Sequence, residues 1–424
     1  MHAALAVIVF AATLIAIVTR PWKLAEPWSA AAGAALMLLT QTVDPGSALA
    51  AIASEWNLFL FFLGLMVTAA VADMAGFFDW AAGLAVLAAR GSGRLLLLNV
   101  LIVGTLITTF LSNDATAVIL TPVVYTMVTR LRVRVMPYLL AVSFIANSAS
   151  MTLPISNPIN LLTGEQLRSP LGGYEAHLLA ASVAAVVITS AVFIAIFWRT
   201  TAARFSIGTA LALTPAAGRG PFFMTVLGAL GALAVAYVVG SALLWPLGVV
   251  AAAGGASLVV IALAFRRFSA DHVRAHVSPT LFVYIAGLFI LVRAVEQAGL
   301  TSALIGGLIA RAGDAPSAVA SGVLGTAVSC NLINNLPAQL IFLSGAHAGG
   351  IATAFRAPFL FGALAGADLG PNLTPVGALS TMLWLVIVRR RGVDVSAWDY
   401  LRIGAIVAPL TLGAAGVLIA LSFR

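Results

Sequence analysis

The chain has 424 residues, of which 62% are hydrophobic and only 8% are charged, and its formal net charge is +8. A soluble domain carries about 25% charged residues, because polar groups must cover its surface. The composition therefore excludes a soluble enzyme or binding domain and indicates a multi-pass membrane protein. The single cysteine, Cys330, excludes an internal disulfide, and the positive charge lies in short Arg-rich loops, which argues against nucleic-acid binding.

Apolar stretches of about 20 residues have the length that spans a bilayer as a helix. The first of them has no basic segment before it, so we expect a spanning helix and not a cleaved signal peptide. Uninterrupted stretches predict spanning helices at 2–19, 26–43, 56–76, 176–198, 222–240, 246–265, 279–298 and 403–422. Two shorter segments, 78–90 and 300–312, predict helices at the membrane interface.

Four further apolar stretches are interrupted by polar residues. The stretches 93–129 and 315–346 are broken at "SND" and "INN", and we predict that both are re-entrant hairpins. The stretches 135–166 and 352–388 are broken at "LPISNPIN" and "DLGPNLTPVG", where proline interrupts the helical hydrogen bonds. Irregular backbone at membrane depth is tolerated only inside the protein or beside a water-filled cavity. We therefore expect the four breaks to surround a central site.

The basic residues predict the orientation of the chain. Loops on the cytoplasmic side of a membrane protein carry an excess of Lys and Arg. In the predicted layout 17 of the 22 basic residues fall on one side, and the exceptions are Arg168, Arg293, Arg311, Arg356 and Arg424. The basic side is predicted to be cytoplasmic, and both termini then face outward.

The two halves of the chain resemble each other. Four blocks recur in the same order at a nearly constant spacing: "LFLFFLG" with "LFVYIAG", "VADMAG" with "AVEQAG", "SNDATAVILTP" with "INNLPAQLIFL", and "NPIN" with "TPVG". The third pair aligns Asn113 with Asn334 and Asp114 with Asn335. The first hairpin is predicted to open to the cytoplasm and the second to the outside. Inverted repeats with broken helices are typical of secondary transporters, whose substrate binds near the midplane.

These features predict an all-α fold of about ten transmembrane helices plus two re-entrant hairpins in two inverted repeats. The predicted parts are N-terminal scaffold helices at 1–55, a first repeat at 56–199, a cytoplasmic linker at 200–221, scaffold helices of the second repeat at 222–278, and the core of that repeat at 279–424.

Three polar blocks resemble the ArsB family of arsenite efflux permeases, which belongs to the ion transporter superfamily. They are "FLSNDATAVILTPVV", "NLINNLPAQL" and, above all, "GADLGPNLTPVGALSTMLWL" at 366–385. The resemblance implies export of arsenite and antimonite in exchange for protons across a bacterial or archaeal inner membrane, which gives arsenic resistance. It also implies an elevator-type transport domain on a scaffold, no cofactor and, in some members, a soluble ATPase partner of the ArsA type. The sequence contains no GxxxxGK[ST] motif, so any use of ATP would need that partner.

The residues at the breaks fit this substrate. Arsenous acid has three hydroxyls that each donate and accept hydrogen bonds, and an Asn amide offers both functions. The predicted substrate residues are Ser112, Asn113, Asn157, Asn160, Asn334, Asn335, Asn372 and Thr374, with Ser156 as a further hydroxyl. Cys330 is expected to be a small buried residue and not an arsenic ligand, because free Cys is usually a core residue.

Two carboxylates at the breaks, Asp114 and Asp368, are the candidates for proton coupling, because an ionisable group inside a membrane is costly. Either could also cap a half-helix. The mirror copy has Asn335 where the first repeat has Asp114, so we expect Asp114 to be the first candidate.

Other charged residues are predicted to be structural. Arg293 and Glu296 are three residues apart on a helix and are expected to pair with each other. Asp73 ends its helix near the interface. His272 and His276 lie in an Arg-rich loop, and we expect them to be solvated and to form no metal site, because no third ligand is nearby.

Two alternatives remain open at this point. A sodium-coupled antiporter or a carboxylate transporter on the same fold would bind a hard cation through Asp114, Asn side chains and backbone carbonyls. A channel subunit energised by a soluble ATPase would need no coupling ion.

Overall fold

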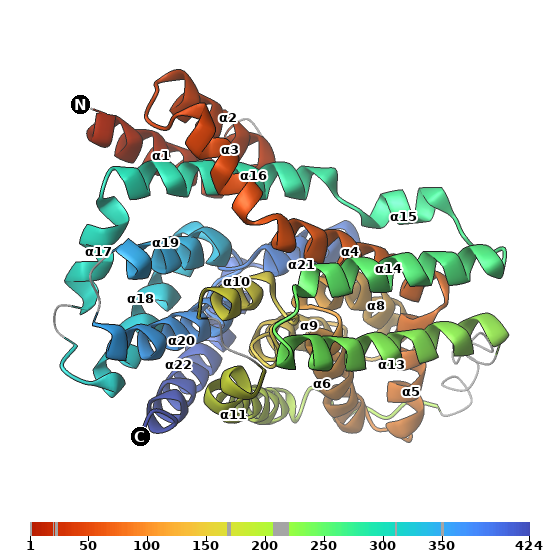
Figure 1. The fold of residues 1–424 in the computed structure, drawn as a ribbon. Coiled ribbons are helices and arrows are strands. Elements are labelled where there is room, and N and C mark those ends of the chain that lie inside the picture. Colours follow the sequence, from red (N-terminus) through yellow and green to blue (C-terminus); the bar gives the residue numbers. More distant parts are fainter. Residues whose placement is uncertain are drawn as a thin grey trace.

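The computed structural model describes residues 2–19, 21, 24–167, 171–206, 220–309, 312–348 and 352–424. In this part of the chain the regular structure is helical, and the only β pairing is an isolated antiparallel bridge between Ser92 and Arg204. The predicted all-helical class is confirmed (Figure 1). The predicted linker at 200–221 lies mostly outside the described residues.

The first half of the chain contains both long and short helices. Their bounds are α1 His2–Thr19, α2 Glu26–Leu39, α3 Pro45–Ser54, α4 Trp56–Met74, α5 Phe77–Ala88, α6 Gly93–Phe110, α7 Asn113–Ala115, the π-helical segment η2 Thr116–Leu120, α8 Thr121–Arg130, α9 Met136–Ser148, α10 Pro158–Leu167 and α11 Leu171–Phe197.

The second half has a similar succession. Its elements are α13 Pro221–Ala242, α14 Leu247–Ala264, α15 Ala270–His276, α16 Pro279–Gln297, α17 Leu300–Ile309, α18 Ala315–Ile333, α19 Asn335–Ala348, α20 Thr353–Leu369, the 3₁₀ turn η4 Gly370–Asn372, α21 Leu379–Arg390 and α22 Ala397–Leu421.

Eight helical segments in the described residues are long and apolar enough to cross a membrane, against about ten predicted. They are α4, α6, the segment Gly173–Phe197 of α11, α13, α14, the segment Ala270–Gln297 that comprises α15 and α16, α18 and α22. The predicted helix at 26–43 is shorter than expected, because α2 ends at Leu39 and has 14 residues. The hydroxyl groups of Thr40 and Thr42 donate to carbonyls of its last turn, and Gln41 has a φ of 53°.

The helices break where the polar blocks predict. The break between α9 and α10 covers 149–157, and the break between α20 and α21 covers 370–378. Short tips separate α6 from α7 and α18 from α19. The π-helical segment η2 follows the first tip, because Pro122 has no N–H group with which to continue a regular helix at this point.

Aligned positions of the two halves make equivalent contacts. Gly64 of α4 lies so close to α14 that an added Cβ would be 2.2 Å from the carbonyl carbon of Ala251. Gly287 of α16, which aligns with Gly64, approaches α2 in the same way, and its Cβ would lie 2.9 Å from the carbonyl carbon of Ala30. The two aligned glycines thus each let their helix approach another helix closely, which supports the internal repeat.

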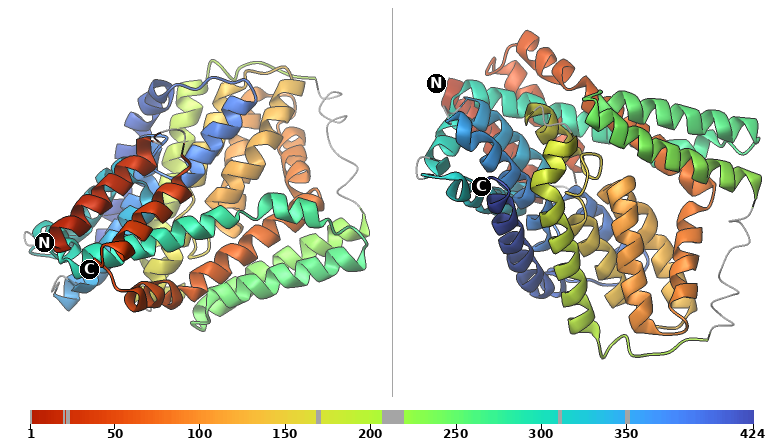
Figure 2. Two further views of the ribbon diagram at one scale, coloured as in Figure 1. Left: turned by 90° about the horizontal axis from the view of Figure 1, so that it is seen from above. Right: turned by 60° about the horizontal axis from the view of Figure 1, so that its bottom comes forward.

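Figure 1 shows α1, α2, α3 and α16 gathered along one edge of the molecule, and α13 and α14 against α4. Both termini lie at one end and α15 lies at the opposite end, as Figure 2 also shows. This agrees with the prediction that the two termini face the same side of the membrane.

The contact between α18 and α20 brings the second break close to the second hairpin. Gly362, Gly366 and Gly370 recur every four residues along this face, and an added Cβ at Gly366 would lie 2.4 Å from the carbonyl oxygen of Val323. Small residues at this spacing let helix backbones approach closely in a membrane.

Gly366→Leu should destabilise the protein, because the side chain would force α20 away from α18. Overpacking of this kind costs about 1–3 kcal/mol or more. The measurement is the thermal unfolding midpoint of the purified protein. Gly413→Leu on the exposed face of α22 is the control, because nothing lies within 4 Å of its Cβ position, and it should unfold like the wild type. Equal midpoints for both variants would contradict the close contact.

Candidate functional site

A small cavity lies where the two halves of the chain meet. Asn113 and Asp114 of the first tip line it, together with Asn157 of the first break, Asn335 of the second tip and Ser380 of α21. Its volume is about 30 Å³. This is room for about two water molecules, at roughly 10–15 Å³ each. Four of the predicted site residues, from both repeats, therefore share one cavity.

Local hydrogen bonds position the first tip. Ser112 caps the helix that follows, because its hydroxyl oxygen accepts a hydrogen bond of 3.1 Å from the backbone N–H of Ala115. The backbone N–H of Asn113 donates to the carbonyl oxygen of Ser156 at 3.0 Å, which joins the tip to the first break. Asp114 follows in the first helical turn and is half-buried. The cap of this helix is thus Ser112 and not Asp114, which the sequence had allowed as a cap.

The cavity lining has unused hydrogen-bond acceptors. The side-chain oxygen of Asn113 is buried and has no protein partner, while the amide nitrogen of that residue reaches the Ser380 hydroxyl at 3.5 Å. No group of the described residues donates a hydrogen bond to the Asp114 side chain. Because buried polar groups are normally paired, such acceptors indicate a place for a ligand or water with hydroxyl donors.

Asp114 also lines a second and larger cavity of about 440 Å³. This cavity extends to His276 and Ser278 between α15 and α16, at the end of the molecule opposite the termini. A third cavity of about 630 Å³ lies near the other end of α16, where Glu55, Glu165 and Arg293 contribute to its wall. The small cavity thus lies between two larger ones on opposite sides.

Asp368 is buried in the last turn of α20 and is connected to the cavity through Asn157. One carboxylate oxygen of Asp368 accepts hydrogen bonds of 2.6 Å from the Ser150 hydroxyl and 2.6 Å from the Asn157 amide. The other oxygen is buried and has no protein partner. Asn157 is therefore shared between the cavity wall and this carboxylate.

Other predicted substrate residues hold the broken backbone. The Asn160 amide donates to the carbonyl oxygens of Ser150 at 2.6 Å and Leu153 at 3.1 Å. The Asn334 amide donates to the carbonyl oxygen of Val376 at 3.3 Å. These amides satisfy carbonyls that the breaks release, and neither residue lines the small cavity.

Asn372 and Thr374 lie in the second break and are also outside the cavity wall. The Asn372 amide donates to the Ser148 hydroxyl at 2.9 Å, and the Thr374 hydroxyl donates to the side-chain oxygen of Asn331 at 2.7 Å. Substrate contact by these two residues stays a prediction.

Sequence reasoning missed four polar residues of this region. Asn147 donates to the side chains of Asn372 and Thr381, and Ser150 donates to Asp368. Asn331 donates to the carbonyl oxygen of Gly370 at 2.9 Å, and Ser380 lines the small cavity. The available signal was a polar side chain in an apolar helix within a few residues of a break. The four missed residues are Asn147, Ser150, Asn331 and Ser380.

Two structural expectations are confirmed and one is wrong. Cys330 is buried and free, and Arg293 pairs with Glu296 at 2.9 Å. The expectation that no third ligand is near His272 and His276 is wrong, because Asp73 at the end of α4 lies against both imidazoles. The sequence analysis missed this contact because Asp73 is far from the two histidines along the chain.

Known proteins resemble the chain along nearly its whole length. The family described as "Arsenical pump membrane protein", ArsB, matches residues 5–421. An arsenical pump membrane protein of Escherichia coli K12 is 28% identical over 407 residues, which is 94% of both chains. An uncharacterized transporter of Mycobacterium tuberculosis is 25% identical over 86% of this chain and 85% of its own.

Two solved transporter structures share the fold. The YdaH transporter of Alcanivorax borkumensis has a TM-score of 0.56 at 15% identity and covers 88% of this chain and 87% of its own. MtrF of Neisseria gonorrhoeae, described as one of a class of antimetabolite efflux pumps, has a TM-score of 0.53 at 14% identity and covers 91% and 84%. At these identities the likeness shows the fold alone.

Glu55 gives the third cavity a pH-sensitive group. Burial first, and then the nearby Glu165 carboxylate, raise the pKa of Glu55 from 4.5 to about 7. Between these two values the folded protein holds a proton that the unfolded chain has released, so its stability falls as the pH rises through this range.

Glu55→Gln should remove this pH dependence, because the amide carries no charge at any pH. Relative to the wild type, the variant should gain thermal stability as the pH is raised from about 4.5 to 7 and keep that gain above 7. The measurement is the unfolding midpoint at pH 5 and pH 8. Asp44→Asn is the control, because Asp44 is a solvent-exposed carboxylate at the other end of α3 from Glu55. A difference between wild type and Glu55→Gln that is the same at both pH values would contradict the raised pKa.

Proposed function

Because the chain belongs to the ArsB family of arsenical pump membrane proteins, we propose that it exports arsenite and antimonite from the cell in exchange for protons. The observation that carries the proposal is the cavity shared by both repeats, with amides and one carboxylate in its wall. The chain is a membrane transporter and not an enzyme, and export by it would confer resistance to arsenic.

The chemistry of the cavity suits a small neutral hydroxide. Arsenous acid presents three O–H donors, and the unpaired oxygen of Asn113 and the Asp114 carboxylate are acceptors in the wall. The amide groups of Asn157 and Asn335 add donors for the hydroxyl oxygens. A cavity of about 30 Å³ is smaller than four heavy atoms require, so its wall would have to widen on binding.

Proton exchange needs a carboxyl group that the substrate and the solvent can both reach. Asp114 meets this condition, because it lines both the small cavity and the 440 Å³ cavity. A proton on Asp114 would remove one acceptor from the wall and so weaken substrate binding. Asp368 is a second candidate, through the hydrogen bond that its carboxylate accepts from Asn157.

Alternating access would come from movement of one part of the fold against the other. We propose that the segments at 93–129 and 315–346 are re-entrant hairpins, and that they move with the broken helices as an elevator against the scaffold. The larger cavities on opposite sides of the small one support this movement. Each of them would be the route from one face of the membrane.

The alternative functions would differ from proton-coupled export in recognisable ways. A carboxylate transporter would place a cation near its anionic substrate, and the described wall of the small cavity contains no Arg or Lys. A sodium-coupled carrier would use the same oxygen atoms for the ion. A channel subunit driven by an ArsA-type ATPase would show no transport on an ion gradient alone.

Inside-out vesicles that contain the protein should accumulate arsenite when their lumen is acidic, without sodium or ATP. The acidic lumen stands for the outside of the cell, so protons leave as arsenite enters. The measurement is lumenal arsenic after imposing a pH gradient, a sodium gradient, or ATP with the soluble ATPase. Uptake only with sodium, or only with ATP and the partner, would refute proton exchange in favour of the matching alternative.

Asp114→Asn should lower uptake driven by the pH gradient by at least about tenfold, because an amide of the same shape cannot exchange a proton. In this variant, exchange of labelled arsenite at equal pH on both sides should fall less, relative to the wild type, than uptake driven by the pH gradient. Asp79→Asn on α5, outside the small cavity and the 440 Å³ cavity, is the control. If driven uptake survives in Asp114→Asn and fails in Asp368→Asn, the coupling group is Asp368.

A further inference from the structure

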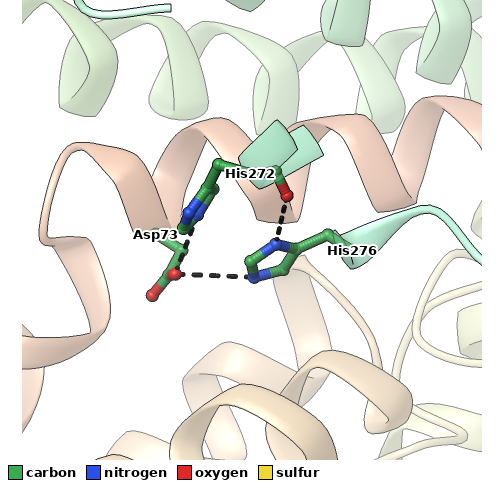
Figure 3. A group of neighbouring side chains, drawn as sticks. All are labelled: Asp73, His272 and His276. Atoms are coloured by element: carbon green, nitrogen blue, oxygen red, sulfur yellow. Dashed lines mark hydrogen bonds and ion pairs between the residues drawn. The ribbon is translucent and has the colours of Figure 1, made fainter. Parts of the chain in front are cut away.

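Three side chains with metal-ligating atoms converge (Figure 3) beside α15, at the end of the molecule opposite the termini (Figure 1). Asp73 lies at the end of α4, and His272 and His276 lie one helical turn apart on α15. The Nε2 atom of His272 is 3.1 Å from Oδ2 of Asp73, and the Nε2 atom of His276 is 3.4 Å from the same oxygen. The three ligand atoms all lie within 4.8 Å of one another. We propose that these residues bind a divalent transition-metal ion of the zinc class.

The spacing of the ligand atoms fits one ion. Zinc is bound at about 2.0–2.2 Å by nitrogen and oxygen atoms, usually in a tetrahedral arrangement, which places neighbouring ligand atoms about 3.4 Å apart. The two distances to Asp73 have this length. The two imidazole nitrogens lie within 4.8 Å of each other, so small side-chain rotations bring all three atoms onto a single ion.

The hydrogen bond that His276 makes to the backbone leaves its Nε2 atom facing Asp73. The Nδ1 atom of His276 is 2.9 Å from the backbone carbonyl oxygen of His272, which is visible in Figure 3. A carbonyl only accepts, so Nδ1 carries the proton, and in the neutral ring Nε2 directs its lone pair toward Asp73. A backbone carbonyl that holds the distant nitrogen in this way is typical of metal-bound histidine.

His272 provides independent evidence that its Nε2 atom lacks a ligand partner. Its Nε2 atom is shielded from solvent and forms no hydrogen bond, although Asp73 is 3.1 Å away. The contact therefore brings a nitrogen and a carboxylate oxygen together without hydrogen-bond geometry. Two atoms that share a metal ion have this relation.

The ligand set selects the kind of metal. Imidazole nitrogen suits Zn²⁺, Co²⁺, Ni²⁺ and Cu²⁺, whereas Mg²⁺ and Ca²⁺ prefer oxygen ligands. The side chains of His272, Asp73 and His276 are 33%, 29% and 20% exposed. This partial exposure leaves room for water as a fourth ligand, as in open zinc sites.

An ion at this place would fasten α15 to the end of α4. His276 also lines the 440 Å³ cavity that reaches Asp114, and α16 begins at Pro279, shortly after it. The ion would therefore fix the connection between α14 and α16 at the mouth of that cavity. The site is separate from the small cavity and does not depend on which substrate is exported.

Cobalt binding to the purified full-length protein tests the proposal. The affinity tag is removed, the protein is treated with a chelator, and Co²⁺ is added while visible absorption is recorded. We expect ligand-field bands that saturate at one ion per chain and disappear when Zn²⁺ is added. Absence of a saturable band in the wild type would overturn the proposal and leave an ion pair that joins α4 to α15.

Variants identify the ligands. His272→Gln, His276→Gln and Asp73→Asn should each weaken Co²⁺ binding at least about tenfold, since even the loss of an outer partner costs about 10–100-fold. Asp271→Asn, on the same helix with a side chain that is 95% exposed, and His347→Ala should bind like the wild type. Size-exclusion profiles check that each variant is folded. Unchanged binding in all three ligand variants would place the ion elsewhere and overturn the assignment.

Discussion

Every backbone group freed at a helix break must find a partner within the protein, because the bilayer interior offers none. This constraint explains the abundance of Asn at the breaks. The amide of Asn160 bonds two carbonyls of the first break, and Asn331 bonds the carbonyl of Gly370 in the second. The backbone of Asn113 in turn bonds Ser156, so the first hairpin tip and the first broken helix support each other. The site exists because these irregular segments are held in place.

The same constraint divides the polar residues into two groups. Amides that satisfy carbonyls, such as Asn160 and Asn334, have little capacity left for a ligand. Asn113 has an unpaired oxygen in the cavity wall, where a hydroxylated substrate can bond to it. The proposed proton site follows the asymmetry between the repeats, since the structure places Asp114 and its counterpart Asn335 in one cavity. Among the described residues, Asp114 is thus the one carboxyl group in the wall of the small cavity, and its charge can change when it gains or loses a proton.

Close helix contacts join parts of the chain that are distant in sequence. The aligned residues Gly64 and Gly287 each let their helix approach another helix closely, α4 on α14 and α16 on α2. Gly366 does the same between α18 and α20 and so positions the helix that carries Asp368. Packing of this kind depends on shape more than on hydrophobicity, because lipid is as apolar as the side chains.

The sequence by itself determined the membrane class, the helical fold, the approximate position of each break and the family. These properties follow from local apolar length, from proline and from polar blocks, which act within a few residues of the chain. Only the tertiary structure decided which Asn residues face the cavity and which bond the backbone, because both uses need the same side chain at the same kind of break. It also decided that Asp73 meets His272 and His276. That cluster joins α4 to α15, and no pattern along the chain brings such distant helices together.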